Sequence, residues 1–344
     1  MADAKASATA MVAALSGAAL ATLLGLPAGA LIGSTLGVAA ATAMGFRVAV
    51  PSRLRDVAFA LIGISLGSGI DEDVFGQIGQ WTLSLAILVV ALIATMAAGI
   101  VVLDRVFGLD RETGALASSP GTMSNAIAIA VDGRGDATAV MFLQLMRLFV
   151  LVVAVPPLAV FLDGGGSAAP GQIDPMGWVP LLAVFALSLT LGTIGGRVGF
   201  PAASLLGGML VSAGAHAFGL AHGGAPGWLV MLAFAITGAV LASRLERIGR
   251  GQIRRYAVAG AASVGIALLL SLVFAMVVKA LTGLPFGQVW IAFAPGGIEA
   301  MAAIGLSLGY DPAYIAIHHF ARIFALVLIV PAFLRLTPGG ARRS

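Results

Sequence analysis

Long apolar stretches separated by short polar segments occupy almost the whole of the 344-residue chain. A helix that crosses a lipid bilayer needs about 20 mostly apolar residues, and ten stretches match or approach this length. They are 9–24, 28–45, 56–70, 79–104 and 137–162, followed by 176–196, 201–219, 226–243, 256–281 and 312–335. Two further apolar segments, 113–131 and 289–308, contain a Pro-Gly interruption. This pattern predicts an all-α, polytopic membrane protein.

The composition supports the same class of protein. Only 10% of the residues are charged, against roughly 25% in soluble domains, and the 46 glycines suit close packing of membrane helices. The chain contains no cysteine, which excludes disulfides and thiolate metal sites. The sequence has neither a basic face nor a recognised soluble module, so it does not predict binding of nucleic acid. The apolar run 9–24 is interpreted as a retained helix, not a signal peptide, because 176–196 is its counterpart in the second half.

The polar and helix-breaking residues recur at a fixed spacing of 175. Of the 42 positions in 117–158, twelve are identical to their counterparts in 292–333. Hydrophobicity alone would match Ala and Val, whereas the identical pairs include Pro120 and Pro295, Gly121 and Gly296, Asp136 and Asp311, Arg147 and Arg322, and Pro156 and Pro331. The chain is therefore predicted to be an internal duplication, with a first repeat at 1–162, a linker at 163–175 and a second repeat at 176–344.

The loop charges predict how the two repeats are oriented. Cytoplasmic loops of membrane proteins are enriched in Lys and Arg, whereas the segments 71–73 and 163–175 contain neither and are predicted to lie outside. The loop after 56–70 is acidic, but its counterpart after 226–243 is rich in arginine. The predicted cytoplasmic clusters are Arg47, Arg53 and Arg55, then Arg244, Arg247, Arg250, Arg254 and Arg255, and finally Arg335, Arg342 and Arg343.

Equivalent loops on opposite sides of the membrane indicate two repeats of inverted topology, each with an odd number of crossings. Five crossings and one re-entrant Pro-Gly helix in each repeat satisfy this condition. They predict ten crossings, with both termini in the cytoplasm, in a bacterial inner (plasma) membrane. A broken Pro-Gly helix that does cross, combined with another hairpin that does not, satisfies the parity equally well.

The paired Pro-Gly breaks predict a central binding site. Non-helical backbone within a membrane is tolerated where protein or water satisfies its polar groups, and paired breaks in inverted repeats are typical of secondary transporters. The half-helix after each break would direct free amides towards an anion. The alternative is a proline kink in an ordinary helix. The candidate substrate-binding residues are Ser119, Pro120, Gly121, Thr122, Ser124 and Asn125 at the first break, and Pro295, Gly296 and Gly297 at the second.

Five further polar residues in the apolar segments complete the candidate site. Arg147 and Arg322 lie inside the last helix of each repeat, where a charge is costly and is usually paired or faces a cavity. They would bind an anionic substrate or exchange salt bridges, or else form fixed contacts with Glu299 or with carbonyls freed at the breaks. Glu299 would bind Na⁺, carry a proton or neutralise Arg322. His319, the counterpart of Gln144, is a candidate proton-responsive group.

Four segments of the chain resemble the duplicated membrane protein family called AbrB. They are Leu26–Gly33, Ala117–Ser124, Ala294–Met301 and His318–Arg322. Members are catalogued as membrane AbrB-family transcriptional regulators or as ammonia monooxygenases, so the resemblance implies regulation of gene expression or an oxidation. The first break departs from the family pattern, because Thr122 and Ser124 stand where Gly and Glu are expected. The small soluble DNA-binding domain also called AbrB is a different protein.

The residues themselves favour a membrane transporter or exporter of a small anionic or amphipathic solute, and no enzyme activity or cofactor is expected. Na⁺ or H⁺ is the candidate coupling ion, membrane lipid is an expected partner, and a homo-oligomer is compatible with the sequence. The first alternative is a membrane sensor that affects gene expression indirectly. The second is a monooxygenase, which is disfavoured because the residues offer too few plausible ligands for a catalytic copper or di-iron centre.

Overall fold

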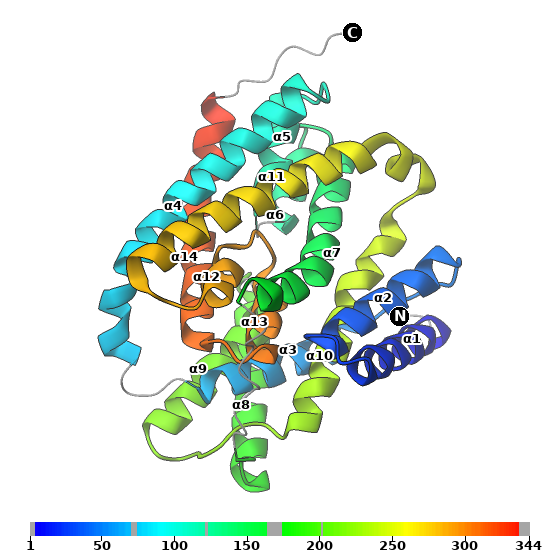
Figure 1. Cartoon of the computed structure of the whole chain (residues 1–344). Helices are drawn as coiled ribbons and strands as arrows, with labels where there is room; N and C mark the ends of the chain where they lie inside the picture. The colour runs from blue at the N-terminus through cyan, green and yellow to red at the C-terminus, as the bar shows by residue number, and fades with distance from the viewer. Residues whose placement is uncertain (1–3, 70–73, 121–122, 164–173, 201, 337–344) are drawn as a thin grey trace. The chain divides into compact units, whose positions relative to one another are not determined.

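The computed structural model describes residues 4–69, 74–120, 123–163, 174–200 and 202–336, and within them it is an all-α protein (Figure 1). Among these described residues, seven segments are helical, long and apolar enough to cross a membrane. The predicted class, an all-α polytopic membrane protein, is therefore confirmed. The segments lie in α1 (Ala4–Leu23), α4 (Val74–Arg105), α7 (Ala137–Leu162), α8 (Trp178–Arg197), α10 (Gly227–Ser243) with the following 3-10 turn η1 (Arg244–Arg247), α11 (Arg250–Thr282) and α14 (Pro312–Leu336).

Three other predicted crossings are helical but short. The helices α2 (Gly29–Ala43), α3 (Ser52–Gly67) and α9 (Ala203–Ala217) contain 15, 16 and 15 residues. At 1.5 Å per residue, each is about 23 Å long, less than the roughly 30 Å of a bilayer's hydrocarbon core. The residues directly before α2 and α9, Ala28 and Ala202, adopt left-handed backbone angles, with φ of 54° and 51°. The two helices therefore begin after these residues.

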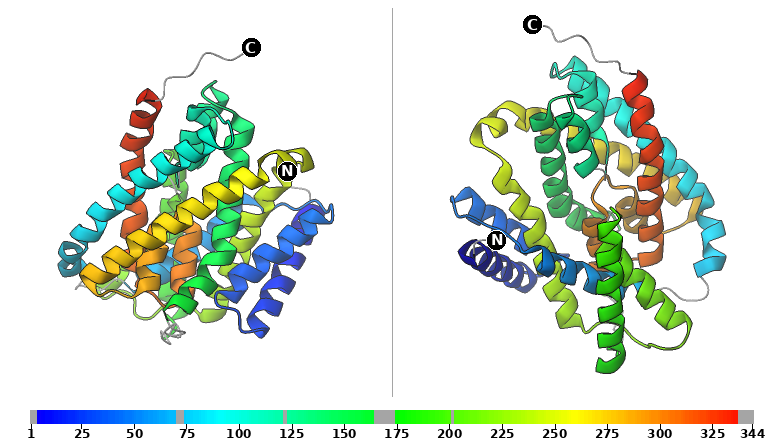
Figure 2. Two further views of the ribbon diagram at one scale, coloured as in Figure 1. Left: turned by 45° about the horizontal axis from the view of Figure 1, so that its top comes forward. Right: turned by 180° about the vertical axis from the view of Figure 1, so that it is seen from behind.

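One compact unit comprises Met1–Gln80, Val152–Glu246 and Ile298–Ala316. In it, α1 lies beside α2, and α8 lies beside α9 (Figures 1 and 2). Helix α3 packs on α9 and α8, and α10 packs in the same way on α2 and α1. Exchanging α1, α2 and α3 for α8, α9 and α10 leaves this set of contacts unchanged. Helix α13 (Ile298–Ser307) contacts both α3 and α10.

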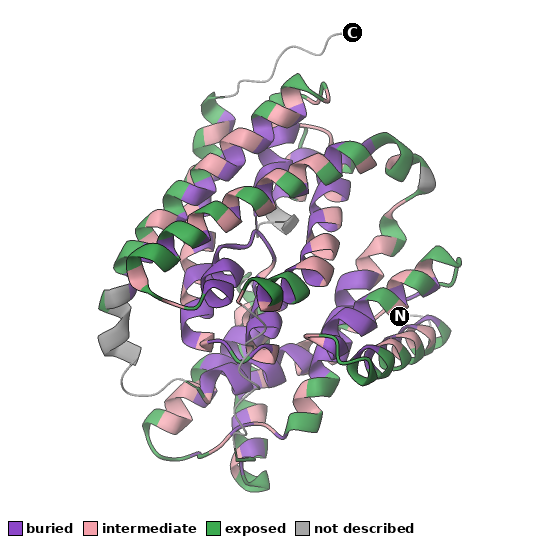
Figure 3. Ribbon diagram, viewed as in Figure 1, coloured by how far each residue is buried: buried purple, intermediate pink, exposed green. Residues whose placement is uncertain are grey.

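The other compact unit comprises Trp81–Leu151, Arg247–Gly297 and Ile317–Ser344. Its core combines buried side chains of α4, α7, α11 and α14 with those of the short helices α5 (Arg111–Ser118) and α6 (Met123–Val131). Helix α12 (Phe286–Phe293) packs on α11 and is buried along its entire length (Figure 3).

The two compact units do not coincide with the two repeats predicted from the sequence, because each unit takes helices from both halves of the chain. The spacing of 175 nevertheless recurs in the helix boundaries. Helices α5 and α12 have first residues 175 positions apart and last residues 175 positions apart. The first residues of α6 and α13, and those of α7 and α14, are separated by the same distance in sequence. Asp136 and Asp311 are the N-caps of α7 and α14. Each carboxylate accepts hydrogen bonds from backbone amides two and three residues further on.

Candidate functional site

Both predicted helix breaks are present in the structure. Helix α5 ends at Ser118 and α6 begins at Met123, whereas α12 ends at Phe293 and α13 begins at Ile298. A proline disfavours helical angles in the residue before it. Accordingly, Ser119 and Ala294 have extended angles, with ψ of 117° and 132°. The Pro-Gly sequence therefore favours the end of both helices.

The two prolines of the breaks line the same small cavity. Pro120 and Pro295 meet there with Phe293 and with side chains of α4 and α11, including Thr95 and Ser271. The cavity measures about 10 Å³, enough for roughly one water molecule. The breaks are thus adjacent in the described fold, but the space between them is closed to an organic solute.

Each buried arginine binds the end of the half-helix that precedes a break. Arg147 donates from Nη1 to the Ala117 carbonyl at 3.1 Å and from Nη2 to the Ser119 carbonyl at 3.0 Å. Arg322 donates from Nη1 to the Ala294 carbonyl at 2.6 Å and from Nη2 to the Gly296 carbonyl. The last carbonyls of a helix have no partner within it, and Arg147 supplies donors at the end of α5. Arg322 binds carbonyls of the break itself, where the Ala294 carbonyl also accepts from the Gly296 amide at 2.8 Å.

The residues three positions earlier make a second pair of equivalent contacts. Gln144 donates from Nε2 to the Leu116 carbonyl at 2.7 Å, and His319 lies with Nε2 3.1 Å from the Ile291 carbonyl. Because a carbonyl only accepts, Nε2 of His319 carries the proton. Leu116 and Ile291 are themselves 175 residues apart, so one amide and one imidazole perform the same task in the two halves.

Four polar atoms of these side chains remain buried without a hydrogen-bond partner among the described residues. They are the Nε donors of both arginines and two acceptors, Oε1 of Gln144 and Nδ1 of His319. The ion pairs described in this unit join Arg111 to Asp104 and Arg134 to Glu112. Neither buried arginine takes part in any described ion pair.

The remaining predicted site residues make no contact equivalent to those of the arginines, Gln144 and His319. Ser119, Pro120, Pro295 and Gly296 are buried and Gly297 is half-buried at the breaks. Glu299 lies in the first turn of α13, in the other compact unit. It is half-buried and forms no ion pair in the described part of the chain. Gly121 and Thr122 lie outside the described residues, as do the side chains of Ser124 and Asn125.

Several buried polar residues of this unit were not predicted from the sequence. His318 is fully buried, with Nε2 2.8 Å from the hydroxyl of Ser84, and the Trp290 indole donates to Ser271 at 3.1 Å. The Ser84 hydroxyl donates its own hydrogen to the Trp81 carbonyl, so His318 is the donor of that contact. A single serine in an apolar helix carries no sequence signal of such a role, because its partner lies on a distant helix.

Two polar pairs connect distant segments near the ends of helices. Tyr256 donates to Asp136 at 2.8 Å, and Tyr310 donates to Asp163 at 2.5 Å. Burial raises the pKa of Asp136, but the hydrogen bonds from Tyr256 and from two backbone amides, with the charge of Arg255, outweigh it and lower the pKa. Burial and the hydrogen bond to Asp163 raise the pKa of Tyr310.

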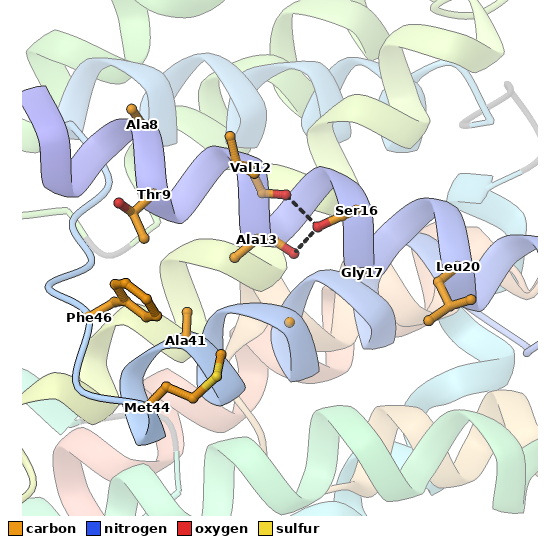
Figure 4. A pocket seen from close by; sticks show the side chains of 11 residues that line it. Ala8, Thr9, Val12, Ala13, Ser16, Gly17, Leu20, Ala41, Met44 and Phe46 are labelled. Atoms are coloured by element: carbon orange, nitrogen blue, oxygen red, sulfur yellow. Dashed lines mark hydrogen bonds between the residues drawn. The ribbon is translucent and has the colours of Figure 1, made fainter.

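Larger cavities lie elsewhere in the chain. One of about 660 Å³ lies along α1 and α2 and is lined almost wholly by apolar side chains (Figure 4). Its Ser16 hydroxyl donates to carbonyls of its own helix, at Val12 and Ala13. Another, of about 610 Å³, contains hydroxyl groups and one carboxylate. Among the described residues, no group of three His, Asp or Glu side chains is arranged to hold a metal ion.

A model of the family described as "Transition state regulatory protein AbrB" matches residues 31–337 of the chain. The chain belongs to the AbrB family. One relative, "Putative regulator AbrB" of Escherichia coli strain K12, is 28% identical over 305 residues, which is 85% of this chain and 84% of the relative. Another, "Uncharacterized protein YhjN" of Bacillus subtilis strain 168, is 27% identical over 299 residues, 80% of this chain and 76% of the relative.

Proposed function

We propose that this AbrB-family membrane protein is a secondary transporter or exporter of a small anionic or amphipathic solute, bound at the two helix breaks. The observation that carries the proposal is the pair of buried arginines, each fixed to the carbonyls of one break. An arginine at the centre of a membrane helix is unfavourable by about 2.5–3.5 kcal/mol on insertion scales. Carbonyl dipoles offset part of this energy but bring no negative charge.

An oxyanion would complement what these arginines leave unsatisfied. Each guanidinium uses its two terminal nitrogens on carbonyls, and each Nε is a buried donor without a described partner. A carboxylate accepts two such donors and neutralises the charge. The acceptors on Gln144 and His319 would favour a solute that also carries a hydroxyl or amino donor.

The repeated geometry supports a transporter more than a rigid scaffold. Equivalent residues 175 positions apart make equivalent contacts at both breaks, and the helix contacts of the other compact unit are preserved when the halves are exchanged. Inverted repeats with ten crossings would allow the protein to alternate between two related conformations. The cavity of about 10 Å³ implies that helices must move to admit a solute.

A thermal-stability screen of the detergent-purified protein against small organic acids, amines and Na⁺ tests the site. A ligand that binds only the native state stabilises it by about 2.7 kcal/mol at 100 times its Kd. We expect organic acids to raise the melting temperature, and we expect Arg322→Gln to abolish this effect. The matched control is Arg335→Gln, which removes an exposed arginine of the same helix. Acid binding that survives Arg322→Gln in a folded protein would refute the proposed site.

A membrane sensor is the second candidate, because the Escherichia coli relative is named as a regulator. A sensor binds its ligand without moving it, so flux of the identified acid into liposomes distinguishes the two functions. Transport coupled to H⁺ or Na⁺ through His319 and Glu299 is part of the proposal. Solute accumulation driven by an ion gradient should then be lost in Glu299→Gln or His319→Gln while the acid still binds. Accumulation that both variants retain would remove these residues from the coupling step.

A further inference from the structure

The cavity of about 610 Å³ lies entirely within the compact unit that contains α2, α3 and α10. Its wall is formed by the end of α1, the beginning of α2, the ends of α3 and α13, one side of α10 and the segments near residues 175 and 224. Pro175 and Gly224 are paired as a backbone bridge, and the Met176 amide donates to the Gly224 carbonyl at 2.7 Å. The volume falls within the roughly 300–1,000 Å³ of ordinary small-molecule sites.

The serines of the cavity offer hydrogen-bond acceptors. Ser65, Ser68 and Ser307 each donate their hydroxyl hydrogen to a backbone carbonyl of their own segment, at 3.1, 3.0 and 2.8 Å. A hydroxyl that has donated its hydrogen still has lone pairs. These three oxygens can therefore accept hydrogen bonds from a ligand.

The beginning of α2 offers donors to the same cavity. Gly29 and Ala30 are the first two residues of the helix and line the cavity, and the first amides of a helix have no partner within it. The residue before them, Ala28, provides no side-chain cap. Its left-handed backbone turns the chain into the helix at this point.

The described wall of the cavity offers no buried charge that would offset the burial of an ionic ligand. Of the described residues that line it, Asp174 alone is charged. Asp174 is exposed, so solvent screens its charge, and a buried ionic head group would lack a compensating partner. Val230, Met231 and Phe234 of α10 supply an apolar wall.

We propose that this cavity binds a neutral amphipathic molecule, an amide or an alcohol attached to an apolar body. Such a head group both donates to the serine oxygens and accepts from the α2 amides. The loop charges predict that Asp174 lies outside the cytoplasm, so the ligand would enter from that side. The inference does not rest on the proposed transport, because the buried arginines belong to the other compact unit.

Single cysteines can test the site, because the chain has none of its own. Ser68→Cys places a thiol in the cavity wall. Ser243→Cys is the matched control, because Ser243 is 175 residues later, is also half-buried and also donates to a carbonyl three residues back. The reaction of N-ethylmaleimide with each variant would be timed in the detergent-purified full chain. The probes are 3-phenylpropionamide, 3-phenylpropionate and 3-phenylpropylamine, which share one apolar body.

At ten times its Kd, the neutral amide is expected to slow labelling of Ser68→Cys about ten-fold by mass action and to leave Ser243→Cys unchanged. Equal slowing of both variants would show partition into detergent and overturn the proposal. So would the absence of slowing at Ser68→Cys, or stronger protection by either charged analogue.

Phe234→Ala provides an independent measurement that needs no thiol. It removes apolar wall and should raise the Kd of the amide in calorimetry, whereas Phe59→Ala should not. Phe59 is the counterpart of Phe234 on α3, is also buried and does not line the cavity. Should Ser68→Cys fail to fold, Ser307→Cys places the thiol at the end of α13 in the same cavity, with the same expected protection. An amide Kd that is unchanged in Phe234→Ala would refute the assignment.

Discussion

The close crossing of α3 and α9 makes a quantitative prediction for Gly208. A methyl group added to this glycine would collide with the carbonyl oxygen of Ala60 and would lie 3.0 Å from the Ile64 amide nitrogen. Both obstacles are backbone atoms of α3, so no side-chain rotation can make room. The helices must separate for Gly208→Ala to be accommodated.

The expected effect follows from two opposing terms. Overpacking of a close-packed interior destabilises by about 1–3 kcal/mol, and an obstacle made of backbone places this site in the upper half of the range. Alanine is a better helix former than glycine by about 0.8–1.0 kcal/mol. The free energy of unfolding should therefore fall by about 1–2 kcal/mol in Gly208→Ala.

The matched control lies on the same helix. A methyl group on Gly214 would meet no atom within 4 Å, so Gly214→Ala should raise the free energy of unfolding by about 0.5–1 kcal/mol. Both variants would be unfolded with sodium dodecyl sulfate in mixed micelles and followed by far-ultraviolet circular dichroism. Equal stabilisation by both substitutions would refute the close crossing of α3 and α9.

Three further predictions concern hydrogen bonds and backbone conformation. Tyr256→Phe removes a hydrogen bond to the Asp136 carboxylate and should lower stability by about 1.5–3 kcal/mol. The bond lowers the pKa of Asp136 below its ordinary 3.8. The difference in stability between the wild type and Tyr256→Phe should therefore have its full size above pH 3.8 and decrease as the pH falls below it. A difference that does not change with pH would contradict this reasoning. The melting temperature of His319→Gln should lie within a few degrees of the wild-type value, because Gln144 makes the equivalent contact. His319→Ala should have a lower melting temperature. Equal melting temperatures of the two variants would show that the contact does not stabilise the fold. Ala28→Gly should raise the free energy of unfolding by up to about 1 kcal/mol, because glycine adopts left-handed backbone angles without the strain of alanine. A lower free energy of unfolding, measured by chemical denaturation, would contradict the backbone conformation described.

The helix breaks and caps were predictable because their causes are local. A proline fixes its own φ and restricts the residue before it, so Pro120 and Pro295, each followed by a glycine, favour the ends of α5 and α12. Proline alone is not sufficient, because Pro156, Pro157 and Pro331 lie inside α7 and α14. The carboxylates of Asp136 and Asp311 bind amides two and three residues away. The spacing of 175 can likewise be measured in the sequence, and it matches the observed boundaries of α5 and α12.

The contacts of the buried arginines were left as alternatives by the sequence. Arg147 and Arg322 could bind a carboxylate or freed carbonyls, and the structure fixes carbonyls 26–30 residues away as their hydrogen-bond partners. A long side chain reaches only what tertiary packing brings to it. Glu299 shows the same limit, because its membership of a different compact unit could not be derived from its sequence position.

The sequence by itself determined where helices form and break, because apolar content, prolines and capping residues act within a few positions of the chain. Tertiary structure alone decided that each compact unit combines helices from both halves and that Pro120 and Pro295 line one cavity. It also created the cavity at the start of α2 from segments that are distant in sequence. These features depend on which apolar faces pack together, and many helix pairs of similar hydrophobicity could satisfy the sequence pattern equally well.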